Sequence, residues 1–154
     1  MQLIKLFSYP YLNERLAMKR NSCLSLALHT LGHMAAEPGR VRTSSVIAEH
    51  AGTNPVVVRR VLGRLREAGL LTSEKGHAGG WRLAKSPTNI TLADVYLALD
   101  ERLVARDQAL ATPSCSLEGA LYKRIAGVLE EVEQSLIERL AETRISDVGQ
   151  AHEH

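Results

Sequence analysis

Arginines at helical spacing are the first residues of this sequence that point to chemistry. Arg59, Arg60 and Arg64 recur within NPVVVRRVLGRLRE (54–67). Guanidinium groups bind phosphates and donate paired hydrogen bonds to guanine, so a helix that carries them suits the DNA major groove. A solvated amphipathic helix is the commoner origin of such a pattern, but its outer face would mix both signs of charge. The outer face here stays cationic until Glu67, which favours nucleic acid.

The glycine-rich stretch KGHAGGWRLAK (75–85) is the second candidate for contact with DNA. Its glycines, among them Gly76 and Gly79, permit positive φ angles and let backbone N–H groups come close to phosphates. Lys75 and His77 can touch the phosphate backbone or the minor groove. For His77, plain exposure to solvent is an equally good interpretation.

Two short helices are predicted to position the arginines. Thr43 is an N-cap for a helix over 44–51, SSVIAEHA, which ends at Gly52. Asn54 caps the next helix, which has Pro55 at its first position and runs to residue 68. Two helices joined by GTN have the spacing of a helix-turn-helix.

The second of these helices has two distinct faces on a helical wheel. Its inward face is apolar and should lie in the core, with Val58, Val61, Leu62 and Leu65. Its outward face is centred on Val56, Arg59, Arg60 and Gly63, with Arg64 at the edge. We therefore expect the outward face to contact DNA.

A β-hairpin should follow the second helix. Leu70–Ser73 and Trp81–Ala84 can pair as two short strands on either side of the glycine-rich tip. A hairpin in this position is the wing of a winged helix. Trp81, the single tryptophan of the chain, should fold back onto the helices and anchor the wing.

Composition and charge limit the class of protein. A chain of 154 residues with 45% hydrophobic and 23% charged residues is typical of one globular domain. The sequence has neither a long apolar run nor the pattern of a signal peptide, so we expect a cytoplasmic protein that does not contact a membrane. Residues 42–85 have a net charge of +5, and residues 86–154 one of −6. This asymmetry suggests a polyanionic partner for the basic half alone.

The motifs together resemble a known family. The run NPVVVRRVLGRLREAGLLTSEKGHAGGWRLA (54–84), with ITLADVYLALDE (90–101) after it, is similar to the Rrf2 family of winged-helix transcriptional regulators. The most specific part is LREAGLLxSxKGxxGGWxLA, where the family usually shows Arg-Gly and Gly-Gly-Tyr. The resemblance covers residues 18 to about 148. Met18 is therefore a candidate for the true start, with residues 1–17 as an extension; alternatively, the extension packs on the domain.

The resemblance implies a mainly α-helical fold in separate parts. A winged helix-turn-helix DNA-binding domain with a two-stranded wing spans 18–88. Residues 89–148 form a linker helix, a loop and a long C-terminal dimerisation helix, and 149–154 form a disordered tail. The linker helix should begin with a capping box of Thr91 and Asp94 and face inward with Leu92, Val95 and Leu99.

A long helix is predicted from Ser116 to about Glu142. Apolar residues recur along it every three or four positions, at Leu117, Leu121, Ile125, Val128, Val132, Leu136 and Leu140. A helix of about 40 Å is too long for one small domain to cover, so its stripe should be buried against a second chain. Packing within its own chain is the alternative. By resemblance it is the dimerisation helix, and ISDV (145–148) begins a last turn that packs across the dimer.

Cysteines are too few for the cofactor that some relatives carry. Cluster-binding members of the family place three cysteines between the helices that flank residues 101–116, whereas this segment holds Cys115 alone. One thiolate cannot hold an iron–sulfur cluster, so we expect no cofactor. Cys115 remains a candidate redox sensor, because a helix N-terminus lowers the pKa of a thiol. An inert small hydrophobe is the commoner role of a lone cysteine.

Histidines raise the question of a metal. His29 and His33 are four residues apart on a helix predicted over 21–36, a spacing that can chelate a transition metal. The sequence shows no third ligand nearby, so we expect no metal site. The same helix should face inward with Leu24, Leu28, Leu31 and Ala35.

The function predicted is that of a dimeric, sequence-specific DNA-binding transcriptional regulator, and we expect a repressor that occludes a promoter. The alternative is a winged-helix protein-interaction module, which would carry an apolar or acidic outer face on the second helix. An enzyme is not expected, because no nucleophile–base pair or phosphate-binding loop is present. The expected partners are operator DNA, a second copy of the chain, and an effector that is either a small molecule or an oxidant. The residues expected to contact DNA are Thr43, Ser44, Asn54, Val56, Arg59, Arg60, Arg64, Lys75, Gly76, His77 and Gly79.

Overall fold

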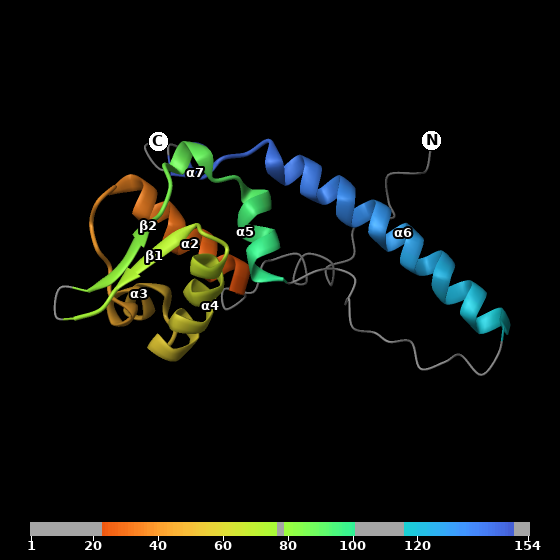
Figure 1. Cartoon of the computed structure of the whole chain (residues 1–154), viewed down its shortest axis with the longest axis horizontal. Coiled ribbons are helices and arrows are strands. Elements are labelled where there is room, and N and C mark those ends of the chain that lie inside the picture. The colour runs from red at the N-terminus through yellow and green to blue at the C-terminus, as the bar shows by residue number, and fades with distance from the viewer. Residues whose placement is uncertain (1–22, 77–78, 101–115, 150–154) are drawn as a thin grey trace, which may run out of the picture.

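The computed structural model describes residues 23–76, 79–100 and 116–149. The elements in chain order are α2 (Cys23–Ala36), α3 (Ser44–Ala51), α4 (Pro55–Glu67), β1 (Leu71–Glu74), β2 (Gly80–Leu83), η2 (Pro87–Asn89), α5 (Leu92–Leu99), α6 (Ser116–Ala141) and α7 (Ile145–Gly149). All but α6 gather in a body, and α6 extends from it to one side (Figure 1). This confirms the predicted fold class, mainly helical with one two-stranded wing. The predictions for the extension, His77, the loop with Cys115 and the tail lie outside the described residues.

Local capping signals set the bounds of the helix-turn-helix, as predicted. The Thr43 hydroxyl oxygen accepts a hydrogen bond from the Val46 N–H at 3.3 Å, and α3 ends at Gly52 with a left-handed φ of 65°. Asn54 Oδ1 accepts from the Val57 N–H at 3.0 Å and so begins α4. These caps hold the two helices one short turn apart.

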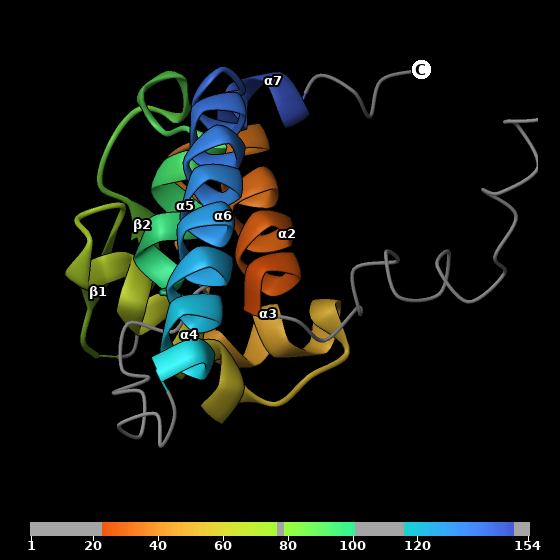
Figure 2. The same ribbon diagram turned by 90° about the vertical axis from the view of Figure 1, so that its right-hand side faces the viewer.

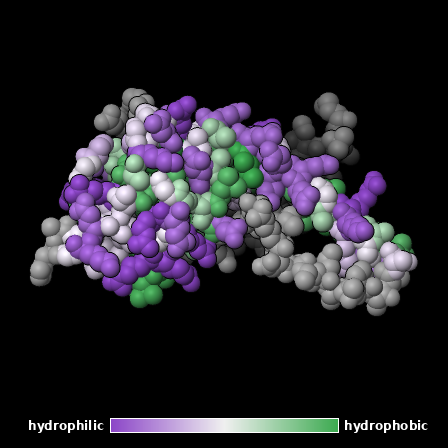
Figure 3. Space-filling model, in the orientation of Figure 1, coloured by the Kyte–Doolittle hydropathy of each residue, from purple (hydrophilic) through white to green (hydrophobic). Residues whose placement is uncertain are grey.

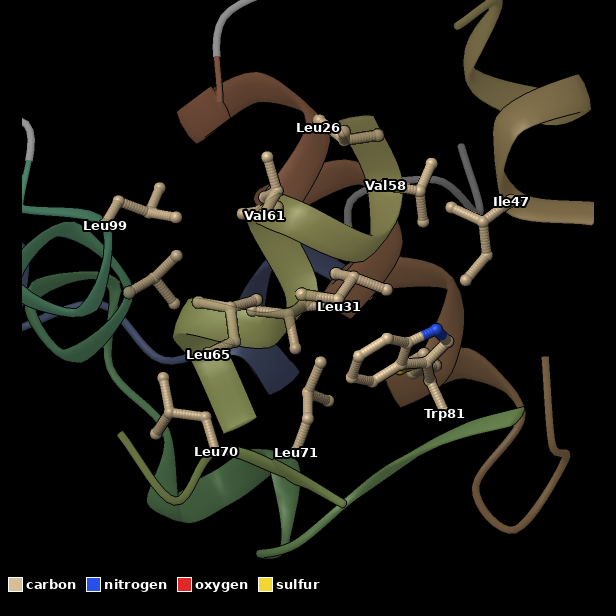
Figure 4. Packing of buried hydrophobic residues seen from close by; sticks show 14 of the residues in the cluster. Leu26, Leu31, Ile47, Val58, Val61, Leu65, Leu70, Leu71, Trp81 and Leu99 are labelled. Carbon is tan, nitrogen blue, oxygen red and sulfur yellow. The ribbon is translucent and has the colours of Figure 1, made fainter. Parts of the chain in front are cut away.

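The core fills the space between α2, α4, α5 and the wing (Figure 4). The predicted inward face of α4 is confirmed, because Val58, Val61, Leu62 and Leu65 are all buried. The predicted inward face of α2 was only partly right. Leu31 is buried, but three other members are half-buried, and the remaining buried positions are Leu26, Ala27, Thr30 and Met34. The reason is that α2 is contacted by α4, α5 and α7 together, so its buried arc is wider than a single stripe.

The wing is an antiparallel pair in which Leu71 lies opposite Leu83 and Glu74 opposite Gly80. Both strands lie within one residue of the predicted bounds. The wing also pairs with the segment before α3, since Trp81 N–H donates to the Arg42 carbonyl at 2.9 Å and Arg42 N–H donates back at 3.2 Å. A Cβ on Gly80 would stand 2.7 Å from that Arg42 carbonyl, so this close pairing requires glycine.

Helix α5 begins as predicted and joins the body to α6. Thr91 and Asp94 form the expected capping box. The Tyr96 hydroxyl donates to Glu133 Oε1 of α6 at 3.1 Å, a buried contact between the two helices. In the views of Figures 1 and 2, the C-terminal end of α6 lies near α5 and α7, and Figure 1 shows its N-terminal end clear of the body.

The last turn, α7, packs on its own chain. Ile145 is buried in the same core as α2, and its N–H donates to the Ile90 carbonyl at 2.9 Å. The short α7 that follows α6 returns to α2, where Ile145 helps to close the core. Val148 at its other end is 39% exposed, and the packing of residues 145–148 across a dimer stays a prediction. Among the described helices, none combines the length and apolar character needed to cross a membrane.

Candidate nucleic-acid interface

An open groove lies between the N-terminus of α3, the outer face of α4 and the wing. Its volume is about 690 Å³. The residues that line it are Thr43, Ser44, Ser45, Arg59, Gly63, Arg66, Ser73, Glu74, Lys75, Gly76, Gly79, Gly80 and Trp81. Six of the residues predicted to contact DNA are thus brought to one surface, from three separate elements.

The N-terminus of α3 forms one wall of this groove. Backbone N–H groups in the first turn of a helix have no acceptor within the helix, and the helix dipole adds positive potential there. Thr43, Ser44 and Ser45 place these groups and three hydroxyls at the groove. Such a wall is suited to a phosphate of a DNA backbone.

Ser44 also fixes the position of the wing relative to α3. Its Oγ accepts a hydrogen bond from the Trp81 indole N–H at 2.9 Å. The indole is otherwise buried, with 7% of its surface exposed. Trp81 therefore anchors the wing on the helices, as the sequence predicted, and holds β2 beside the N-terminus of α3.

The outer face of α4 supplies the charged part of the groove. Arg59 and Arg66 line it directly. Arg60 is exposed on the same helix, and Val56 is 69% exposed, so the predicted outward face is confirmed as solvent-facing. Sequence reasoning missed Arg66, whose Nη1 donates to Ser73 Oγ of β1 at 3.1 Å, because the wing that it contacts comes later in the chain.

The wing tip closes the third side of the groove. A Cβ on Gly79 would collide with the Glu74 carbonyl oxygen and stand 2.9 Å from the Gly76 carbonyl oxygen. Gly76 itself has a φ of 110°, which side chains rarely allow. The backbone conformation at Gly76 and the close contacts at Gly79 therefore require glycine at both positions.

Two residues predicted to contact DNA have structural roles, of which the sequence suggested only the capping role of Asn54. Arg64 Nη1 donates to the Leu99 carbonyl at 2.7 Å, so this side chain caps the C-terminus of α5 and does not line the groove. The Asn54 side chain accepts the capping hydrogen bond of α4. Both residues fix the position of α4 in the body.

A cluster of charges beside the wing holds the segment that leads into α3. Arg42 Nη2 donates to Glu37 Oε2 at 2.6 Å, and Arg40 Nη1 donates to the same oxygen at 2.8 Å. The hydrogen bond from Arg40, with the nearby charge of Arg42, lowers the pKa of Glu37 below its ordinary value. Arg42 is thereby engaged with Glu37 and is not part of the groove.

Proteins similar to this chain carry the names of transcriptional regulators and DNA-binding proteins. YwnA of Bacillus subtilis (strain 168), which is named as an HTH-type transcriptional regulator, is 33% identical over 130 residues that cover 83% of this chain and 95% of YwnA. A crystal structure described as that of a DNA-binding protein is 30% identical, with a TM-score of 0.66, over 82% of this chain and 98% of that chain. CymR (YrzC), the global cysteine regulator of B. subtilis, shares the fold with a TM-score of 0.56 at 22% identity, over 86% of this chain and 96% of that chain.

The model of the Rrf2 family, described as an iron-dependent transcriptional regulator, matches residues 20–151. The donors of this chain do not fit an iron–sulfur cluster. Cys23 on α2 and Cys115, outside the described residues, are the two cysteines of the sequence, whereas most clusters are held by four thiolates. The family match over most of the chain agrees with the groove and the wing described above. The chain belongs to the Rrf2 family of transcriptional regulators.

Proposed function

We propose that the protein is a homodimeric, sequence-specific DNA-binding transcriptional regulator that acts in the cytoplasm. The observation that carries the proposal is the groove, in which the α3 N-terminus, Arg59 of α4 and Lys75 of the wing face one space. An interaction module without DNA binding would need an apolar or acidic surface at this place. The relatives described as regulators and as a DNA-binding protein support the same function.

Helix α4 reads the bases in this proposal. Arg59 and Arg60, both exposed, reach guanine edges in the major groove, and Val56 contacts a thymine methyl group. The α3 N-terminus with Thr43 and Ser44 binds one phosphate. Lys75, Gly76 and Gly79 of the wing, with His77, contact the neighbouring backbone.

Helix α6 provides the dimer interface in this proposal. Of its 26 residues, Glu133 is the one buried, whereas Leu117, Leu121, Ile125, Val128 and Val132 are each more than half exposed. Isolated helices gain most of their stability from packing an apolar face, so α6 needs a cover. An apolar surface is visible where α6 leaves the body (Figure 3), and a second α6 with the same stripe is the cover that fits it.

The twofold symmetry of the dimer in turn determines the spacing of the half-sites in the operator. Two copies of α4 related by twofold symmetry read two half-sites about 34 Å apart, or a multiple of this distance. A dimer bound across a promoter excludes the polymerase, so we propose that the protein acts as a repressor. An effector that changes the tilt of α6 would change the distance between the two reading helices and release the DNA.

The test is to select operator DNA from a random library and then measure binding by Arg59→Ala and Arg60→Ala. Each variant should lose about 1–3 kcal/mol of specific binding if its arginine reads a base. The matched control is Arg139→Ala, which removes an exposed arginine from α6, away from the groove. A wild-type protein that selects no sequence, or arginine variants that bind like the wild type, would contradict the proposal.

A further inference from the structure

Three histidines from two helices lie together outside the DNA-binding groove. His29 and His33 are one turn apart on α2, and His50 lies in the last turn of α3. One ring nitrogen of each lies within 4.8 Å of the other two. The ring centroids of His29 and His33 are 4.6 Å apart, and those of His33 and His50 are 5.7 Å apart.

The fold creates this cluster from residues that are distant in sequence. Ile47 and Ala48 of α3 are buried in the core beside α2, which brings the end of α3 next to its surface. Between the two helices lies a small hollow of about 10 Å³, lined by the three imidazoles with Thr30, Arg42, Val46 and Ile47. This volume is about that of one water-sized particle, so the hollow is suited to a single small ion.

We propose that His29, His33 and His50 bind one divalent transition-metal ion of the zinc class, with water as the fourth ligand. Zn–N bonds of about 2.0–2.1 Å place the nitrogens of a tetrahedral site about 3.4 Å apart. The present separations, up to 4.8 Å, require the rings to approach one another. All three side chains are exposed, so rotation about their χ angles can close this gap without moving the core.

The chemistry of the cluster selects the ion. Three neutral imidazoles and no carboxylate suit Zn²⁺, Co²⁺, Ni²⁺ or Cu²⁺ better than Mg²⁺ or Ca²⁺, which prefer oxygen ligands. The positive charge of Arg42 at the hollow opposes a cation. Glu37 offsets it, because its carboxylate bonds to Arg42 and stays ionised through the Arg40 hydrogen bond that lowers its pKa.

A bound ion would cross-link α3, the first helix of the helix-turn-helix, to α2. The ligands come from α2 on one side and α3 on the other, so the metal cross-links two elements whose contact is otherwise made by apolar side chains. A ligand that binds the folded chain and not the unfolded chain raises the melting temperature. The sequence prediction of no metal site had rested on the lack of a third ligand near His29 and His33, and His50 supplies it.

The test is titration of the untagged full chain with Co²⁺, which absorbs visible light strongly when its coordination is tetrahedral. We expect one equivalent bound per chain, displacement by Zn²⁺, and a higher melting temperature with Zn²⁺. His33→Ala and His50→Ala should lose both the visible bands and the rise in melting temperature. The matched control is the double variant His152→Ala and His154→Ala, which removes two histidines outside the described residues and should bind Co²⁺ like the wild type.

The proposal is overturned if the wild type shows no tetrahedral Co²⁺ bands, if His50→Ala binds like the wild type, or if the double control variant loses binding. Folding is checked separately in the presence of a chelator. There each histidine variant should melt at the wild-type temperature, because these side chains are exposed and not part of the core.

Discussion

The body and α6 differ in how far one chain buries their apolar side chains. In the body, Leu31, Leu62 and Leu65 are fully buried, and helices α2 to α5 pack on one another. In α6, by contrast, the apolar stripe is open to water, with Leu117 68% and Val132 52% exposed. In both regions, apolar residues recur every three or four positions along the helices. This difference supports the proposal that contacts with a second chain cover the apolar face of α6.

The two regions meet at a polar contact. The Tyr96 hydroxyl bonds to Glu133, the one buried residue of α6. A buried polar contact adds less stability than apolar packing of the same area, but it specifies how the two helices meet. Together with the packing of α5 on α6, this contact fixes how the C-terminal half of α6 lies on the body.

The largest effect should come from a cavity in the body. Leu62→Ala removes a fully buried side chain of α4 and should lower the free energy of unfolding by about 2–5 kcal/mol. The matched variant is Leu121→Ala in α6, where the side chain is 57% exposed within one chain. Urea denaturation of dilute protein should show the large loss for Leu62→Ala alone. An equal loss from Leu121→Ala at a concentration where the wild type is a monomer would mean that α6 belongs to the core of the single chain.

A charge in the stripe should break the dimer while it leaves the body folded. Val132→Glu places a carboxylate in the proposed interface and should raise the Kd of the dimer by about 100-fold or more. Gln134→Glu adds the same charge at an exposed position away from the stripe and is the control. Size-exclusion chromatography with light scattering measures both. Two variants with the same mass in solution would contradict the proposed interface.

The smallest effect should come from the anchor of the wing. Ser44→Ala removes the acceptor of the Trp81 indole N–H and should cost about 1–3 kcal/mol, since this donor is part-buried. The change should also broaden the Trp81 fluorescence, because the indole loses its fixed partner. Ser45→Ala, at the next exposed position of α3, is the control and should leave fluorescence and stability unchanged.

Local signals explain what could be predicted from the sequence. The caps at Thr43 and Asn54, the capping box of Thr91 and the turn of the wing depend on residues that are close in the chain. The inward face of α4 follows from periodicity alone. Six of the thirteen residues that line the groove are ones that the sequence predicts to contact DNA.

Contacts between distant segments explain what could not be predicted. The sequence predicts that Arg64 contacts DNA. Its hydrogen bond to the Leu99 carbonyl depends on how α5 packs beside α4, which the sequence does not show. The pairing of Arg42 with Trp81, the return of Ile145 to the core and the approach of His50 to α2 likewise depend on tertiary packing. No periodicity within one segment carries this information.

The central claim is that a second chain completes α6, and sedimentation equilibrium of the wild-type chain tests it most directly. At micromolar concentration we predict a single species of twice the chain mass of 16.9 kDa. The Val132→Glu variant should move towards the mass of one chain in the same experiment. A wild type that stays at 16.9 kDa at every concentration, with its helix content intact, would contradict the account.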